Sequence, residues 1–223
     1  MVLETIFPAV AALKNRKNST KQALMPEILL VSALPAEQIR LSKDIFHTAT
    51  LISGIGKVAA TYALTRALQV TRPDLVLNVG SAGTLHFNPG DVLVCRNFVD
   101  RNLLGLELND TPSRIENTVA ETYCLPPNII SGREDYAFRA VCATGDSFVT
   151  TEAEACGDVV DMEAFAQAYV CKKFGVDFLS VKCVTDVVGK NSLRIWEERL
   201  ADAQQTLEQF FEKYAHILAK NHI

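Results

Sequence analysis

The sequence predicts an α/β fold: a single three-layer α/β/α domain built around a mostly parallel central sheet. Two observations lead to this prediction. From residue 27 onward, short apolar runs typical of buried strands alternate with longer segments whose apolar residues recur at helical spacing. The chain has 223 residues, 48% of them hydrophobic, which is enough for one large domain with a sizeable core. We therefore expect one domain over residues 27–223, preceded by an N-terminal extension over residues 1–26.

The predicted strands are short and apolar, and most of them run into a glycine or a polar residue. The predicted helices are longer, and Gly175 marks the end of one of them because glycine adopts the left-handed conformation at a helix end without a steric clash. The last helix is the longest and carries large apolar side chains along one face. In chain order, we expect strands at residues 28–32, 50–53, 75–79, 91–95, 139–144 and 178–184, and helices at residues 57–70, 162–174 and 192–219.

Two regions do not follow this alternation. Residues 3–13 have apolar side chains at helical spacing and predict a short helix, which a polar and basic segment links to the domain. Residues 101–131 contain three prolines and no clear period, and they support no prediction of individual elements.

Composition and charge exclude several classes of function. The net charge of −4 and the absence of a stretch dense in lysine and arginine argue against a nucleic-acid-binding protein. No apolar run approaches the roughly 20 residues that span a bilayer, and we expect no membrane contact. The six cysteines and four histidines are scattered without metal-ligand spacing, so we expect no metal, no other cofactor and a reducing, cytoplasmic environment.

The most informative acidic residues are Glu163, at the start of a predicted helix, and Asp186, just past the predicted strand at 178–184. Open α/β sheets bind ligands at the carboxyl ends of their strands, so we expect both side chains to face one cleft. Two carboxylates in one site can divide the work, one binding a sugar hydroxyl and the other transferring a proton. This pair therefore predicts an enzyme.

Glycine-rich turns follow three of the predicted strands, at residues 54–56, 80–83 and 145–146. Each turn lets backbone N–H groups come close to an anion or a water molecule. The first turn fits a dinucleotide-binding fingerprint, but such a site needs an acidic residue at the end of the next strand. Asp74 precedes that strand and lies at its wrong end, so nicotinamide binding is not favoured.

Five segments together resemble the purine nucleoside phosphorylase/uridine phosphorylase superfamily. They are Ser53-Gly54-Ile55-Gly56-Lys57-Val58-Ala59-Ala60, Asn78-Val79-Gly80-Ser81-Ala82-Gly83, Gly145-Asp146-Ser147-Phe148, Val160-Asp161-Met162-Glu163-Ala164 and Val184-Thr185-Asp186-Val187. They occur in the family's order, and with weaker flanking similarity the resemblance runs from residue 28 to about 218. It is greatest to the hydrolytic branch, which contains the 5′-methylthioadenosine/S-adenosylhomocysteine nucleosidases, and it implies a small-molecule nucleoside as the substrate.

The resemblance implies roles for several side chains. Asp186 resembles the general acid that protonates N7 of the leaving purine, and Glu163 resembles the carboxylate that binds the ribose hydroxyls, with Met162 beside the sugar. Phe148 resembles the aromatic side chain that stacks on the base, with the Val149 backbone at the base edge.

The nucleophile is less clearly marked. Glu37 resembles the carboxylate that activates water in the nucleosidases, with Ser81 holding the same water. The loop of Glu37 also looks like that of the phosphorylases, in which Arg40 would bind phosphate, but Asn78 stands where those enzymes have a second arginine. Lys182 stands where the nucleosidases usually carry an arginine near the water. One guanidinium holds a phosphate dianion poorly, so we predict hydrolysis, with phosphorolysis by a purine nucleoside phosphorylase as the alternative.

Trp196 lies near the position of an aromatic residue that closes the 5′ pocket in the family. A large flat ring there suits an uncharged 5′ substituent such as an alkylthio group. A futalosine hydrolase is a second alternative for the function. The resemblance also implies a homodimer, for which residues 3–13 and the apolar run at 103–106 are candidate contacts.

Overall fold

The computed structural model describes residues 26–106, 111–116, 119, 123–189 and 192–219. All of the predicted N-terminal extension except Pro26, including its helix at 3–13, lies outside these residues. The strands are β1 (Glu27–Ser32), β2 (His47–Ile52), β3 (Leu75–Thr84), β4 (Val92–Asp100), β5 (Arg114–Ile115), β6 (Asn128–Ile130), β7 (Arg133–Asp135), β8 (Ala140–Thr144), β9 (Val159–Asp161) and β10 (Asp177–Val187). The helices are α3 (Lys57–Leu68), α4 (Ala164–Phe174) and α5 (Ser192–Ala219), with short 3-10 turns η3 (Pro35–Glu37) and η4 (Glu152–Glu154).

The α/β class is confirmed, and the sheet is mixed, with antiparallel as well as parallel pairs. Among the described strands, β1 pairs in parallel with β2 and β3, β3 with β10, and β8 with both β4 and β9. The pairs β10–β4, β3–β9, β4–β5, β4–β6 and β6–β7 are antiparallel. Strand β4 runs in the opposite direction to β3 for a physical reason. Residues 85–91, which connect the two strands, are too few for the crossover that parallel strands need.

Five strands form a closed ring, because β3, β9, β8, β4 and β10 pair in that order and β10 pairs again with β3. Closure brings the carboxyl end of β3 against β9, where Gly83 pairs with Val160. Segments far apart in the sequence therefore meet at one end of the ring, which is where a ligand would be expected in an α/β protein.

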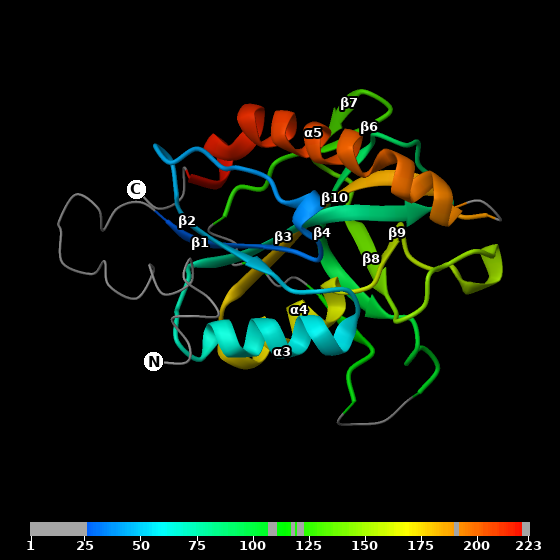
Figure 1. Cartoon of the computed structure of the whole chain (residues 1–223), viewed down its shortest axis with the longest axis horizontal. Helices are drawn as coiled ribbons and strands as arrows, with labels where there is room; N and C mark the ends of the chain where they lie inside the picture. The colour runs from blue at the N-terminus through cyan, green and yellow to red at the C-terminus, as the bar shows by residue number, and fades with distance from the viewer. Residues whose placement is uncertain (1–25, 107–110, 117–118, 120–122, 190–191, 220–223) are drawn as a thin grey trace.

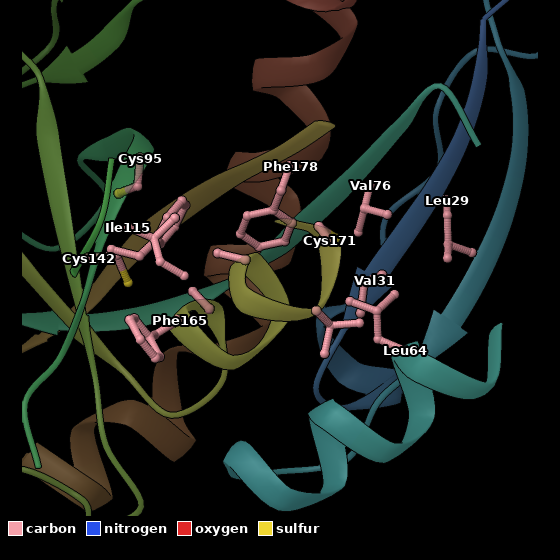
Figure 2. Close-up of a cluster of buried hydrophobic side chains, with 14 of the residues drawn as sticks. Leu29, Val31, Leu64, Val76, Cys95, Ile115, Cys142, Phe165, Cys171 and Phe178 are labelled. Carbon is pink, nitrogen blue, oxygen red and sulfur yellow. The ribbon is translucent and has the colours of Figure 1, made fainter. Parts of the chain in front are cut away.

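The helices cover the sheet from both sides (Figure 1). Helices α3 and α4 pack against one face, in a core that contains Leu64, Phe165 and Phe178 (Figure 2). Helix α5 covers the opposite face and buries Leu207, Phe211 and other apolar side chains against a second core. Gly175 ends α4 with φ of 66°, as predicted.

Two strands extend further than predicted, and both extensions matter for the site. Strand β3 continues through the glycine-rich segment at 80–83, which is therefore part of the sheet and not a turn. Strand β10 continues to Val187, with a shift of register between Val184 and Asp186. Asp186 thus lies on the strand, beyond a β-bulge, and not past its end. Such bulges redirect side chains at sheet edges and beside functional sites.

Candidate active site

A cavity of about 180 Å³ lies where the ends of β3, β9 and β10 meet the start of α5. All eight residues predicted for the site line it, although they come from six separate segments of the chain. They are Glu37, Ser81, Phe148, Val149, Met162, Glu163, Asp186 and Trp196.

The ionisable side chains that line this cavity are of a single kind. Its lining includes four carboxylic acids, Glu37, Asp161, Glu163 and Asp186, all of them buried. Within the described residues, no lysine, arginine or histidine lines it. Its other walls are mostly apolar, with Leu34 among them. A neutral or cationic ligand therefore suits this cavity, and an anion does not.

Glu37 is held rigidly at the cavity edge by the 3-10 turn η3 and strand β3. Its Oε2 accepts a hydrogen bond from the backbone N–H of Leu34, at 3.2 Å. Its Oε1 accepts two, from the backbone N–H of Ser81 at 2.9 Å and from the Ser81 hydroxyl at 2.6 Å. Gly80 allows this close approach, since a Cβ at this position would lie 3.1 Å from Oε1.

Asp186 lies on β10 beyond the bulge, where it pairs with Gly83 of β3, and it lines the same cavity as Glu37. Its Oδ1 accepts a hydrogen bond from the hydroxyl of Thr185 at 2.9 Å, and Gly83 leaves room for Oδ2. Burial raises the pKa of this carboxyl above its ordinary value, against the hydrogen bond from Thr185 and the charge of Arg199. A raised pKa lets a carboxyl hold its proton at a higher pH than an ordinary aspartic acid does, which favours a role as a proton donor.

Glu163 precedes the first turn of α4 and connects two distant parts of the chain. Its Oε1 accepts the backbone N–H of Gly56, at 2.8 Å, in the glycine-rich turn before α3. Burial, followed by the nearby Asp161 carboxylate, raises the pKa of Glu163 to about 8, while Lys182 and the Gly56 N–H act in the opposite direction. Without a ligand, Glu163 therefore holds a proton at neutral pH and can donate it in a hydrogen bond.

Asp161 and Lys182 form an ion pair at the base of the cavity, with Nζ 2.9 Å from Oδ2 and both side chains 2% exposed. Asp161 also accepts hydrogen bonds from the Thr144 hydroxyl and the Ala164 N–H. Burial would raise the pKa of Asp161, but the Lys182 ammonium and these hydrogen bonds hold it below its ordinary value. Sequence reasoning missed Asp161, although it lies within the quoted Asp-Met-Glu motif. Lys182, expected near the water, is bonded to Asp161 and is not among the lining residues.

The aromatic wall consists of Phe148 and Trp196, whose ring centroids are 6.0 Å apart with an edge-to-face orientation. The loop that presents Phe148 is fixed from behind by Arg101, which donates hydrogen bonds to the Ser147 hydroxyl and carbonyl. Arg101 occupies the space beside Gly145, where a Cβ would lie 2.5 Å from Nε. A side chain at position 145 would therefore displace the Arg101 side chain.

The glycine-rich turn before α3 is already occupied by the chain's own acids. Glu163 accepts the Gly56 N–H, and Asp146 accepts the Lys57 N–H at 2.7 Å. These are the donors that would otherwise bind a ligand phosphate at the helix N-terminus. The turn therefore orients the Glu163 carboxyl group of the cavity.

Among the described residues, no cysteine lines the cavity. Cys95, Cys142, Cys171 and Cys183 are buried, and none of the six cysteines forms a disulfide. The described residues contain no cluster of three or more His, Cys, Asp or Glu side chains that could bind a metal ion. No helix in the same part of the chain combines the length and the apolar character needed to cross a membrane.

Comparison with known proteins identifies the family. Residues 47–219 match the model of the phosphorylase superfamily. A 5′-methylthioadenosine/S-adenosylhomocysteine nucleosidase from Haemophilus ducreyi is 33% identical over 174 residues, which cover 67% of this chain and 72% of the relative. The chain belongs to the phosphorylase superfamily. The resemblance inferred from the five motifs is thus confirmed.

Two solved structures share the fold. The Helicobacter pylori 5′-methylthioadenosine/S-adenosylhomocysteine nucleosidase with butyl-thio-DADMe-Immucillin-A has a TM-score of 0.67 and 21% identity, covering 86% of this chain and 98% of that one. The futalosine hydrolase of Helicobacter pylori strain 26695 has a TM-score of 0.68 and 20% identity, covering 87% and 99%.

Two positions decide whether this member of the phosphorylase superfamily has a phosphate site. Arg40, the candidate phosphate ligand, is exposed and does not line the cavity. Asn78 is buried in β3, where its amide donates to the Val31 carbonyl and accepts from the Ser180 hydroxyl. Neither residue brings positive charge to the cavity.

Proposed function

We propose that the chain hydrolyses the N-glycosidic bond of a purine nucleoside of the 5′-methylthioadenosine/S-adenosylhomocysteine type and releases the free base. The proposal rests on the composition of the cavity. Within the described residues, every ionisable group that lines it is a carboxylic acid. Such a cavity stabilises the positive charge that develops on the sugar as the bond to the base breaks, and it repels phosphate. The relative from Haemophilus ducreyi, a nucleosidase by name, supports the same assignment.

Asp186 is the proposed general acid. As the bond between C1′ and N9 breaks, its proton passes to N7 of the purine, so the base leaves as a neutral molecule. The raised pKa of this carboxyl supports the role because the group must hold the proton until the bond weakens. Phe148 would stack on the base, and the backbone of Val149 would contact its edge.

Glu37 and Ser81 are the proposed water site. Glu37 takes one proton from the water as the oxygen attacks C1′, which produces the free sugar. Glu163 would bind the ribose hydroxyls, since one of its oxygens is already fixed by the Gly56 N–H and the other is open to a ligand, and Met162 would lie alongside the sugar. No step requires a metal or other cofactor.

The test is a substrate panel: methylthioadenosine, adenosylhomocysteine, futalosine and inosine, each with and without phosphate. We expect release of adenine from the first two in phosphate-free buffer, with the 5′-substituted ribose as the second product. Faster turnover of futalosine would instead make the chain a futalosine hydrolase. A sugar 1-phosphate, formed at a rate that saturates with phosphate, would contradict hydrolysis and assign Arg40 a role as an anion ligand.

We also propose a homodimer in which the catalytic unit spans residues 27–223. Val58 and Tyr62 lie on one face of α3 and are 82% and 65% exposed, and Ile55 just before the helix is exposed and also lines the cavity. Leu104 and Leu106, in the predicted contact at 103–106, are exposed as well. The absence of disulfides among the cysteines supports a cytoplasmic location.

A further inference from the structure

Trp196 is the single tryptophan of the chain and lies in the first turns of α5. Its ring packs edge-to-face on Phe148 at the cavity wall. Its indole Nε1 is 2.8 Å from the hydroxyl oxygen of Ser81, which in turn is 2.6 Å from Oε1 of Glu37. The three side chains therefore form a continuous hydrogen-bonded series from α5 across β3 to η3.

The direction of this series follows from chemistry alone. An indole N–H can only donate, so the Ser81 oxygen must accept from Trp196. An ionised carboxylate can only accept, so the single proton of the Ser81 hydroxyl must point to Glu37. Both oxygens of Glu37 already accept backbone N–H groups, from Leu34 and Ser81, which is the arrangement expected around a carboxylate. The hydroxyl of Ser81 is thus fixed in one rotational state.

We propose that Trp196 is a positioning residue for the nucleophile, acting through Ser81; the inference rests on the hydrolytic function proposed above. A serine oxygen has two lone pairs, and Trp196 occupies one of them. With the proton directed to Glu37, one acceptor site remains on Ser81. A water molecule that donates one hydrogen to this site and the other to Glu37 has its own lone pair free for C1′.

The ring and the N–H group of Trp196 have different tasks. The ring closes the cavity beside Phe148, a task that any large aromatic residue performs. The N–H group has no equivalent in phenylalanine and orients the Ser81 hydroxyl. If the ring alone matters, removing the N–H has no effect; if the N–H matters, its loss reduces kcat while binding of substrate is retained.

The first experiment removes only the N–H. Because the chain has one tryptophan, incorporation of β-(3-benzothienyl)alanine in place of tryptophan changes this position alone and keeps a bicyclic ring of similar size. We expect kcat for adenine release to fall about three- to tenfold with KM unchanged, which is the range for loss of one neutral hydrogen bond. Trp196→Phe should show the same loss of kcat. Glu197→Gln, an exposed change one residue further along α5, is the matched control and should match the unmodified protein.

A double-mutant cycle tests whether Trp196 acts through Ser81. In a Ser81→Ala background, Trp196→Phe should cause no further loss of kcat, because the hydroxyl that it orients is already gone. Losses that multiply would overturn the proposal and leave Trp196 as a ring that closes the cavity. An unchanged kcat in the benzothienyl protein would also overturn it.

A third measurement does not depend on turnover. The single indole N–H gives one isolated resonance in a spectrum of protein labelled with ¹⁵N-tryptophan. Ser81→Ala should shift this resonance and accelerate its exchange with solvent, and Glu37→Gln should shift it through the hydroxyl. If the resonance is unchanged in Ser81→Ala, the hydrogen bond is refuted, whatever reaction the protein catalyses.

The proposed hydrolysis can fail separately. It would be refuted if the resonance responds to Ser81→Ala but the unmodified protein does not release base in phosphate-free buffer.

Discussion

Glu163 should make the fold less stable as the pH rises, and Glu163→Gln should remove that dependence. Burial and the Asp161 carboxylate raise the pKa of Glu163 from 4.5 to about 8 in the folded protein, whereas the unfolded chain has the ordinary value. Between these two pH values the folded state holds a proton that the unfolded state has lost. The stability contributed by the neutral carboxyl is therefore complete below pH 4.5 and is lost progressively up to about pH 8.

The size of the effect follows from the shift in pKa. Each unit corresponds to about 1.4 kcal/mol, so the free energy of unfolding should fall by roughly 3–5 kcal/mol over this range. A glutamine resembles the neutral carboxyl, can still accept the Gly56 N–H and does not titrate. Relative to the unmodified protein, the variant should therefore gain stability from about pH 4.5 to pH 8 and gain no more above it. For a chain of this length the gain corresponds to roughly 6–20 °C in the midpoint of thermal unfolding.

The assay is thermal unfolding of both proteins from pH 4.5 to pH 9.5, with the difference in midpoint plotted against pH. Taking the difference cancels the contributions of titrating groups that do not interact with Glu163. Glu154→Gln, a change at an exposed glutamate in η4, is the control and should give a flat difference. Parallel curves for Glu163→Gln and the unmodified protein would refute the reasoning, because Glu163 would then titrate alike in the folded and unfolded states.

Three further predictions address catalysis and assembly. Asp186→Asn should fold normally and lose about 10²- to 10⁴-fold in kcat, since the amide cannot transfer a proton; near-native kcat in steady-state adenine release would remove Asp186 from this role. Gly80→Ala should lower kcat about tenfold, because the added Cβ lies 3.1 Å from Oε1 of Glu37 and displaces it; Gly189→Ala, whose Cβ has only an ordinary contact at 3.8 Å, is the comparison, and equal rates would contradict the argument. Val58→Glu should convert the proposed homodimer to a monomer in light scattering, whereas an unchanged mass would locate the interface elsewhere.

The elements predicted with most success have strong local patterns. The boundaries of α5 were predicted at 192–219 because its apolar face repeats over many turns. The end of α4 followed from Gly175 alone. The closed ring of strands was not predicted, since it depends on pairings between distant residues, such as Gly83 with Val160, that leave no local periodicity. Strand β9 has three residues, too few for an alternating pattern.

The sequence motifs were sufficient to select the site residues, because each residue was chosen for the chemistry of its own side chain. Every residue predicted for the site lines the cavity, from Glu37 early in the sequence to Trp196 late in it. Relations between side chains were harder to predict. The partner of Lys182 is Asp161, which lies 21 positions earlier in the chain, and the glycines at 80 and 83 make room for carboxyl groups of the chain itself rather than for an anionic ligand. Only a three-dimensional arrangement carries this information.

The ion pair between Lys182 and Asp161 constrains how this protein can evolve. Losing either partner leaves the other charge uncompensated in the interior, at a cost of about 3–5 kcal/mol, a large part of the stability of an ordinary domain. A sequence with one partner replaced is therefore a poor intermediate, even though a sequence with both replaced can be stable. Descendants of this chain should keep a charged residue at both positions or lose both charges together, and among relatives a charge at one position should predict the opposite charge at the other.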